Sequence, residues 1–417
     1  MTTRAHASTF ELLQGGQAFF PALIRAVDEA QHWVQLETYI FDFHAAGGDV
    51  AEALVRAAER GVRVQVLVDG IGTAPAPPEW LHRFERAGLH WQVYSPLRGW
   101  GFGLLVPERW RRLHRKLCVV DQHELFCGGI NILDDFYDPN HGDLDLPRFD
   151  FTVQVRGPVA EIAADAMALL WWRVQAGYSA RQRHLTQAWE AFKAAGYGGK
   201  TSAGRARAEA DAGQAKHPLG RKKTAQQGKA VLLLRDNLLN RSSIERAYRK
   251  AIGHARREIV IANAYFLPGG RLRRALIQAA KRGVRVTLLL QGKYEYFMQY
   301  HASRPVYGAL LEAGVEIHEY EVSFLHAKVA VIDGHWATVG SSNLDPLSLL
   351  LAREANVVID DPAFAANLRD HLFAAIAGHG RLMEAAAHGR RPLKQRLLDG
   401  LAYALVRLAL LLTRQRY

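Results

Sequence analysis

The chain has 417 residues, of which 49% are hydrophobic and 23% charged, so a fibrous or wholly disordered protein is excluded. At roughly 150 residues per domain this length predicts two or three domains. The 53 Lys and Arg outnumber the 41 Asp and Glu, giving a formal net charge of +12. This charge predicts an anionic partner such as nucleic acid, anionic lipid or a phosphate-bearing substrate. Two cysteines cannot build a disulfide framework.

Membrane targeting signals are absent from the sequence pattern. The first 16 residues contain no apolar stretch of the ~7–15 residues that a signal peptide needs. No window reaches the ~18 uninterrupted apolar residues of a membrane span. We therefore expect the protein to fold in a reducing compartment, the cytosol, and to touch a membrane only from the side.

Helical and strand patterns alternate along the start of the chain. Apolar residues recur at helical spacing over residues 22–30, and a β-branched and aromatic run follows over 34–41. A second helix is predicted over 50–60 and a buried strand over 62–68. This alternation predicts an α/β fold, with a mostly parallel sheet covered by helices on both faces.

The second half of the chain repeats the first. AAERGVRVQVLVDG at 57–70 corresponds to AAKRGVRVTLLLQG at 279–292, and LHRKLCVVD at 113–121 to LHAKVAVID at 325–333. Three more blocks match in the same order: 35–40 with 261–266, 87–94 with 313–320, and 149–155 with 353–359. Five ordered matches indicate a duplicated domain. Just after each LH block, as at 124–129, a second short run is close enough to complete an antiparallel hairpin.

Each half carries the pattern His-x-Lys-x4-Asp, followed by a turn of small residues that contains Asn. The Asn lies 17 residues after the His in both copies, and an acid near the next strand completes each set. The first set is His114, Lys116, Asp121, Gly129, Asn131 and Asp150; the second is His326, Lys328, Asp333, Ser341, Asn343 and Glu354.

These residue types suit a phosphate site. Residues two apart on a strand share a face, so His and Lys should point the same way. Lys and Asn can donate to the non-bridging oxygens while a neutral imidazole attacks phosphorus. A carboxylate beside the ring, Asp150 or Glu354, would hold its tautomer. We expect Asp121 and Asp333 to support the turn and scaffold and not to transfer protons.

Two intact copies favour a two-step phosphoryl-type transfer over a chance pattern. One imidazole would form a phosphohistidine, and the other would protonate the leaving alkoxide and then deprotonate the incoming alcohol. The residues alone do not order the two, because both sit in nearly identical settings. Glu37 and Asn263 occupy equivalent repeat positions at strand ends. Each is either an exposed end or a residue that supports the site from behind.

The paired motif resembles the phospholipase D superfamily, and several stretches resemble bacterial cardiolipin synthases of the B type. These stretches are ILDDFYD at 132–138, RDN at 235–237, IANAYFLPG at 261–269, HWATVGSSNLDPLSLL at 335–350 and EANVVI at 354–359. The resemblance covers roughly 10–172 and 231–376. The first copy departs by having Gly129 where the second has Ser341, so it lacks a hydroxyl that could assist the phosphate.

The resemblance implies two lobes that meet at a pseudo-twofold interface, with the active site between them and no metal or cofactor. It implies transfer of a phosphatidyl group from one phosphatidylglycerol to the hydroxyl of another, giving cardiolipin and glycerol. It further implies that His114 is the nucleophile and His326 the acid/base.

The predicted domains are an N-terminal lobe over 1–178, a basic linker over 179–230, a C-terminal lobe over 231–390 and an amphipathic helix over 391–417. Residues 180–230 carry 11 Lys and Arg against 3 Asp and Glu. Two interpretations of the linker remain open: a solvated connector, or a tether drawn to an anionic surface.

Two apolar segments predict contact with lipid. The 20 residues from Tyr94 to His114 exceed the 6 from Tyr320 to His326 by an insert, 96–110, rich in Trp, Phe and Gly. This insert resembles an interfacial wedge, the alternative being a loop folded onto the core. The helix at 393–417 has leucines at helical spacing with flanking arginines, so it either lies in the headgroup plane or packs on the globular body.

The predicted partners are phosphatidylglycerol and the membrane surface, and no nucleic acid is expected. We therefore expect a peripheral location on the cytoplasmic face of the cell membrane. Alternatives are a phospholipase D-type hydrolase or a nuclease of the same superfamily, which would use the same histidines, and a non-enzymatic basic adaptor. The apolar segments argue against the nuclease, and the two intact motifs argue against the adaptor.

Overall fold

The structure is a computed structural model that describes residues 6–96, 111–181, 226–236, 240, 242–294, 297–345 and 352–412. The elements of the first half, in chain order, are β1 (His6–Gln14), α1 (Gly15–Glu29), β2 (Trp33–Thr38), α2 (Ala46–Glu59), β3 (Arg63–Asp69), α3 (Pro78–Ala87), β4 (His90–Tyr94), β5 (Arg112–Leu113), β6 (Leu117–Val120), β7 (Glu124–Gly128), β8 (Tyr137–Asp138), β9 (Gly142–Asp143), β10 (Phe151–Arg156) and α4 (Pro158–Arg181).

The second half repeats this order, without counterparts of the short strands β5, β8 and β9 among the described residues, and adds elements at its end. Its elements are β11 (Gln226–Arg235), α6 (Ser243–His254), β12 (Glu258–Asn263), α7 (Gly270–Lys281), β13 (Arg285–Gln291), α8 (Phe297–Leu311), β14 (Glu316–Tyr320), β15 (Lys328–Ile332), β16 (Trp336–Gly340), β17 (Ala352–Asp360), α10 (Pro362–His379), β18 (Gly380–Leu382), α11 (Ala385–Gly389) and α12 (Leu393–Leu412).

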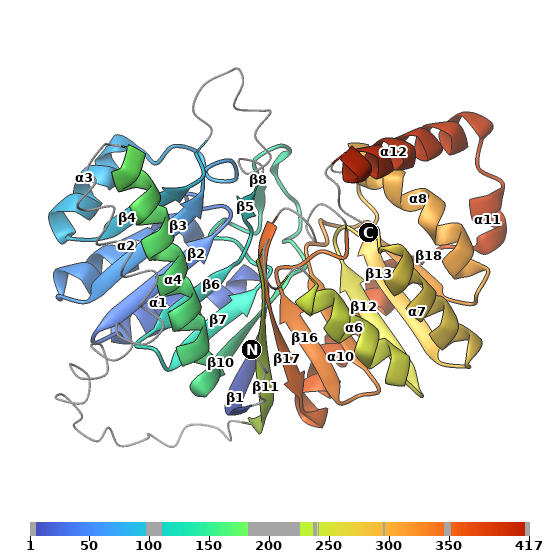
Figure 1. Ribbon diagram of the computed structural model, residues 1–417, viewed down its shortest axis with the longest axis horizontal. Helices are drawn as coiled ribbons and strands as arrows, with labels where there is room; N and C mark the ends of the chain where they lie inside the picture. The colour runs from blue at the N-terminus through green and yellow to red at the C-terminus, as the bar shows by residue number, and fades with distance from the viewer. Residues whose placement is uncertain are drawn as a thin grey trace.

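One sheet runs through both halves, which lie side by side in Figure 1. Its strand order is β18-β14-β13-β12-β15-β16-β17-β11-β1-β10-β7-β6-β2-β3-β4. Apart from the terminal β18, this order reads the same from both ends once each strand is replaced by its repeat equivalent. The palindrome is the signature of the pseudo-twofold relation, and its centre is the antiparallel pair β1–β11.

The α/β class with helices flanking a large sheet is confirmed, but the sheet is mixed and not mostly parallel. Along the main strand order, only the outer strands of each half are parallel, as in β2–β3–β4 and β12–β13–β14, and the short β5 also pairs in parallel with β17. The predicted hairpin β6–β7 is present, and it and the strands at the centre are antiparallel. The reason is connection length: helices link the outer strands, whereas short turns link the hairpin strands, and a short turn permits only antiparallel pairing.

Three apolar clusters hold the layers together. α1, α2 and α3 pack on the strands of the first half, and α6, α7 and α8 pack on those of the second. The largest cluster draws buried residues from both halves and includes α4 and α10. Within it the rings of Phe10 on β1 and Phe364 on α10 lie 5.6 Å apart. The two halves therefore share a core, which fixes their relative position.

The C-terminal helix α12 packs against α8 by one narrow face (Figure 1). Ala402 and Val406 are buried there, and the carboxylate of Asp399 pairs with His301 at 2.7 Å and with Arg391 at 2.7 Å. Exposed leucines on its other faces are Leu393, Leu397, Leu398, Leu401, Leu405 and Leu408. Among the described residues, no helix combines the length and apolarity needed to cross a bilayer.

Candidate active site

The first motif is held in place by the second half of the chain. Strand β5 pairs in parallel with the start of β17, and the backbone N–H of His114 then donates to the carbonyl of Arg353 at 3.0 Å. This register sets His114 beside Glu354. The ring Nδ1 lies 3.0 Å from a carboxylate oxygen of Glu354, whose side chain is fully buried.

The second motif is held by the first half in the same way. The backbone N–H groups of His326 and Ala327 donate to the carbonyl of Phe149, and Phe149 donates to Phe324 at 2.9 Å. The Nδ1 of His326 then lies 2.7 Å from Asp150. Each histidine is therefore paired with the acid of the other half. The sequence suggested that each histidine would be grouped with the acid of its own half. The structure instead pairs it with the acid of the other half.

This crossed pairing brings both motifs into one site. Each Nδ1–H donates to a carboxylate, so each Nε2 carries the lone pair. Lys116 Nζ donates to the carbonyl of its own His114 at 2.9 Å, and Lys328 makes the same bond to His326. The histidines and lysines precede or begin the strands β6 and β15, so the buried strands anchor the motifs from one side.

Burial in a shared, positively charged site lowers the pKa values of both histidines. Desolvation is the largest cause for each, and the charges of Lys116 and Lys328 add to it. For His114, the charge of Glu354 opposes these effects, whereas the pKa of His326 falls well below its usual value. Both rings are therefore neutral at pH 7, the state in which Nε2 is a nucleophile or a base.

The partner acid of His326 behaves differently. Burial raises the pKa of Asp150 to about 7, although Lys328 opposes the change. The His326–Asp150 pair can therefore carry one extra proton at neutral pH, a proton that belongs to the pair. Burial likewise lowers the pKa of Lys116 to about 7. The two dyads are equivalent in geometry but unequal in proton content.

The residues that follow the motifs differ between the halves. The hydroxyl of Ser341 donates to Glu354 and accepts from the N–H of Ala355 at 3.1 Å, so it supports the dyad of His114. At Gly129 an added Cβ would lie 2.3 Å from Asp150 Oδ1, so only glycine leaves room for that carboxylate. The hydroxyl of Ser341 thus bonds Glu354, whereas the missing side chain at Gly129 leaves space for the carboxylate of Asp150.

The asparagines hold the loops beside the site. Asn131 Oδ1 accepts from the N–H of Ile40 at 3.2 Å, which leaves its two amide N–H groups as donors, with no acceptor among the described residues. Asn343 is buried in the equivalent loop. Asn263 Oδ1 accepts from Leu344 N–H at 3.0 Å, so it supports that loop from behind.

Glu37 is also buried and not an exposed strand end. It forms an ion pair with Arg115 at 2.6 Å, and Arg115 lies between the motif residues His114 and Lys116 in sequence. Burial raises the pKa of Glu37, and the Arg115 charge opposes it. Because Arg115 stands between His114 and Lys116, its ion pair with Glu37 on β2 holds this part of the backbone in place.

Asp121 and Asp333 lie outside the site, at the far ends of β6 and β15. The Asp121 carboxylate accepts from the backbone N–H groups of Gln31, His32 and Trp33, each at 2.8 Å. Asp333 accepts in the same way from residues 256–258. Burial raises the pKa of Asp333, but these bonds outweigh it and the pKa is lowered.

The turn itself explains why aspartate stands at these two positions. Asp121 and Asp333 have φ of 47° and 53°, a left-handed conformation that Asp tolerates better than most residues. Asp is the seventh residue after His, so with about 3.3 Å of rise per residue the two lie roughly 20 Å apart. Both aspartates thus serve the scaffold in this structure.

Sequence reasoning missed three residues around the site. Asp69 accepts from the N–H of Leu113 at 2.7 Å, and Gln291 accepts from Leu325 at 3.2 Å, so each anchors the residue before a motif histidine. These two polar residues are the last but one of the matched blocks 57–70 and 279–292, a signal that the repeat alignment contained. The ring of Tyr39 lies 4.9 Å from that of His114 and under Lys116.

Two predicted segments, the apolar insert and the basic linker, lie largely outside the residues that the structure describes. The insert at 96–110 lies outside the described residues from 97 on, as do residues 182–225 of the linker. Around that gap, α4 extends to Arg181 and β11 begins at Gln226.

Two His–carboxylate dyads, crossed between the halves of a palindromic sheet and flanked by lysines, define a phospholipase D-like protein. The family model described as "Cardiolipin synthase, PLD-like domain" matches residues 23–142 and 248–375. The chain belongs to this family.

Known relatives and one solved structure agree with this membership. The chain is 36% identical over 378 residues to cardiolipin synthase B of Escherichia coli strain K12, covering 88% of this chain and 80% of the relative. It is 28% identical over 353 residues to cardiolipin synthase 2 of Bacillus cereus, covering 84% and 61%. Its fold is similar to that of a phosphatidylserine synthase from Haemophilus influenzae, with a TM-score of 0.66, 13% identity and coverage of 98% and 96%.

Proposed function

We propose that the protein is a cardiolipin synthase that transfers a phosphatidyl group from one phosphatidylglycerol to another. The observation that carries the proposal is the crossed pair of dyads, which puts two imidazoles into one site, each paired with a carboxylate of the other half. The relatives named cardiolipin synthase support the choice of substrate.

In the first step, His114 Nε2 attacks the phosphorus and the bond to glycerol breaks. The leaving glycerol alkoxide takes the extra proton of the His326–Asp150 pair, which the raised pKa of Asp150 keeps available at neutral pH. The anionic Glu354 stabilises the positive charge that develops on His114. Lys116 and Lys328 stabilise the non-bridging oxygens.

In the second step, the hydroxyl of another phosphatidylglycerol gives its proton to His326 and its oxygen attacks the phosphohistidine. The P–N bond breaks, His114 is restored, and cardiolipin leaves. The proton returns to the His326–Asp150 pair, so the cycle consumes no other reactant. The amide N–H groups of Asn131 and Asn343 are the further donors that we assign to the phosphate.

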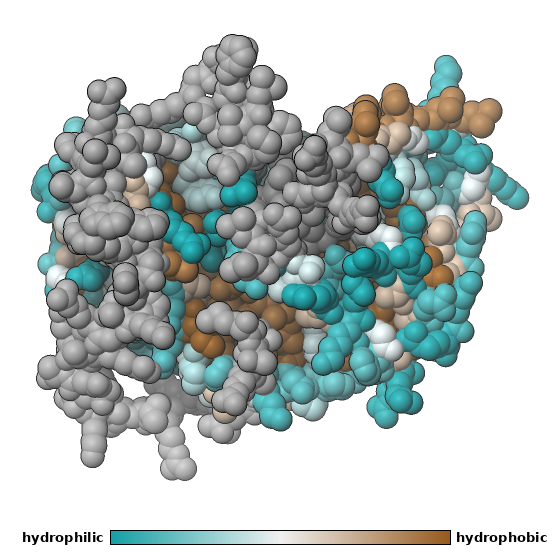
Figure 2. All heavy atoms as spheres, in the orientation of Figure 1, coloured by the Kyte–Doolittle hydropathy of each residue, from teal (hydrophilic) through white to brown (hydrophobic). Residues whose placement is uncertain are grey.

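The proposal includes a peripheral position on the cytoplasmic face of the membrane. Supporting it, the leucine face of α12 is open: Leu393 and Leu397 are each 73% exposed. Figure 2 shows this apolar surface along the edge of the second half. Further exposed apolar residues lie in the segments that follow the strands and motifs of the site, in loops or at the start of β8 and α8: Ile71, Phe136, Tyr137, Leu146, Tyr294 and Phe297.

The test is mass spectrometry of lipids formed by the purified protein from phosphatidylglycerol, without divalent metal. We expect cardiolipin and glycerol, and no product from the His114→Ala variant. Phosphatidic acid as the only product would instead indicate a hydrolase. Salt-sensitive cleavage of DNA with no lipid product would indicate a nuclease.

A further inference from the structure

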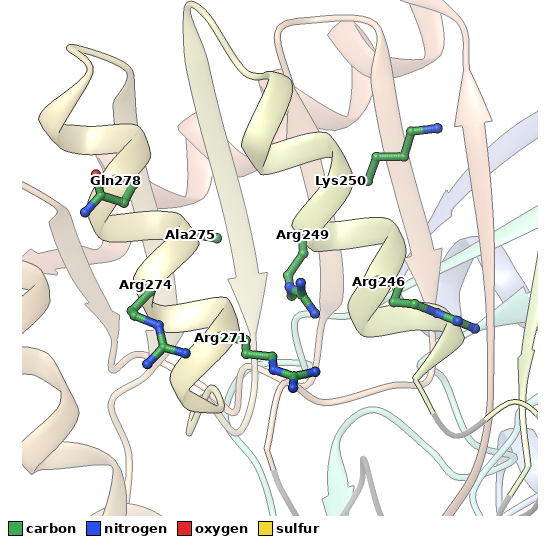
Figure 3. Close-up of a pocket in the computed structure, with 7 residues that line it drawn as sticks. All are labelled: Arg246, Arg249, Lys250, Arg271, Arg274, Ala275 and Gln278. Atoms are coloured by element: carbon green, nitrogen blue, oxygen red, sulfur yellow. The ribbon is translucent and has the colours of Figure 1, made fainter. Parts of the chain in front are cut away.

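An open groove of about 680 Å³ lies between α6 and α7 on the outer surface of the second half. Its lining is mostly cationic. The lining residues are Arg246, Arg249, Lys250, Arg271, Arg274, Ala275 and Gln278. Figure 3 shows that Arg249 of α6 and Arg271 of α7 reach into the space between the two helices. The groove thus concentrates five positive charges.

Almost none of this charge is compensated within the described part of the chain. Only Arg249 has an acidic partner, Glu245 at 4.0 Å; the other four cations form no ion pair there. Like charges on facing helices repel one another, and a groove focuses their field outward. An anion bound between the helices would relieve that repulsion.

The fold itself does not require this charge, because the first half builds the equivalent helix pair without it. α1 and α2 together hold two Arg and five Asp or Glu, a net of −3. There Arg56 is paired with Asp28 at 2.9 Å, and Glu52 with Arg83. α6 and α7 hold seven Lys or Arg and one Glu, a net of +6. The positive charge is therefore specific to the α6–α7 surface and is not needed to form the helix pair.

The groove begins at the edge of the sheet that carries the catalytic residues. α6 starts at Ser243, whose hydroxyl donates to Leu234 at 2.7 Å, near the end of β11. α7 follows β12, which ends at Asn263 opposite Lys328. Both helices thus have their N-terminal turns, with Arg246 and Arg271, at the catalytic edge.

We propose that this groove binds the phosphate groups of anionic phospholipids at the membrane surface and so docks the second half on the bilayer. The inference rests on the lipid-transfer function proposed above. α8 contacts both α7 and α12, so the cationic groove and the exposed leucines of α12 lie on neighbouring helices of the second half. A cationic surface near an apolar one is the combination that a charged bilayer surface attracts.

The chemistry of the lining favours lipid over nucleic acid as the occupant. None of the described residues that line the groove is aromatic, so unpaired bases would find no ring there on which to stack. The exposed leucines nearby would have no role on DNA. Arginine, the main cation here, forms bidentate hydrogen bonds with phosphate oxygens, which suits a headgroup phosphodiester.

The experiment measures sedimentation with vesicles, using His114→Ala protein so that no lipid is consumed. The test variant adds Arg246→Gln, Arg249→Gln, Arg271→Gln and Arg274→Gln. The control adds Arg63→Gln, Arg86→Gln, Arg256→Gln and Arg257→Gln, four exposed arginines outside the groove without ion pairs among the described residues. Thermal unfolding verifies that both are folded.

We expect the groove variant to lose on the order of a hundredfold or more in partitioning onto phosphatidylglycerol vesicles, and the control to lose much less. Equal losses in the two variants, or unchanged binding by the groove variant, would overturn the proposal. Loss of DNA binding with retained vesicle binding would overturn it in favour of nucleic acid. Cardiolipin formation from detergent-dispersed substrate by the wild type tests the catalytic proposal separately.

Discussion

In the first half a buried glutamate, Glu37, forms an ion pair with Arg115, whereas the equivalent positions of the second half hold Asn263 and Ala327. Both arrangements hold a motif histidine from behind, one by charge and the other by neutral hydrogen bonds and close packing. The same backbone arrangement therefore accepts either an ion pair or neutral residues behind the motif, which allows the two halves to take different chemical roles.

The dyads diverge in the same manner. His114 faces Glu354, whose charge raises the histidine pKa against burial, while His326 faces Asp150, whose own pKa is raised to about 7. Environments that separate the pKa values of paired groups assign acid and base roles. The comparison therefore predicts His114 as the nucleophile and the His326–Asp150 pair as the proton store.

Removing either histidine should lower transfer by a factor on the order of 10³ or more, but the two variants should fail at different steps. With a phosphodiester that has an activated leaving group, His326→Ala should still form phosphohistidine at His114. His114→Ala should form none. Peptide mass spectrometry detects the adduct, and an adduct on His326 would reverse the assignment.

The Glu37–Arg115 pair can be converted to the arrangement of the second half. Arg115→Ala leaves a buried carboxylate without its partner and should cost about 3–5 kcal/mol of unfolding free energy. The double variant Glu37→Asn and Arg115→Ala should recover most of that loss, since it recreates the neutral pair. Urea unfolding measures both. A double variant no more stable than the single one would refute this equivalence.

The turn residues beside the acids should respond unequally to exchange. Gly129→Ser puts a Cβ against Asp150 and should cost about 1–3 kcal/mol, with a matching fall in kcat as the carboxylate is displaced. Ser341→Gly removes only one hydroxyl bond to Glu354 and should cost about 1 kcal/mol. Calorimetry and initial rates compare the two, and equal effects would argue against the crowding of Asp150.

The pH dependence of the transfer rate should distinguish the contribution of the His326–Asp150 pair from that of Lys116. The raised pKa of Asp150 keeps the extra proton on the His326–Asp150 pair below about pH 7, and the lowered pKa of Lys116 means that the lysine charge is lost above about pH 7. The rate should therefore fall above pH 7 with a slope approaching two protons. Asp150→Asn should have a lower rate and a slope of one. Identical slopes would remove Asp150 from proton transfer.

Much of this architecture could be predicted from the sequence. The repeat, the α/β alternation and the His, Lys and Asn of each motif follow from local patterns and their spacing. The position of Asp121 and Asp333 away from the histidines was also predictable, because a residue five positions past the lysine on a buried strand must lie at its far end. The resemblance of the motifs then led to the family.

The crossed dyads could not be predicted, because nothing local says which strand lies beside which. Spacing tells which face a side chain occupies, but the partner of His114 lies 240 residues away and is set by the pairing of β5 with β17. The same holds for the mixed sheet and for the groove between α6 and α7. The sequence determines the residue types and their spacing along each strand or helix. Which strands and helices become neighbours is decided only when the two halves pair and pack on their shared core.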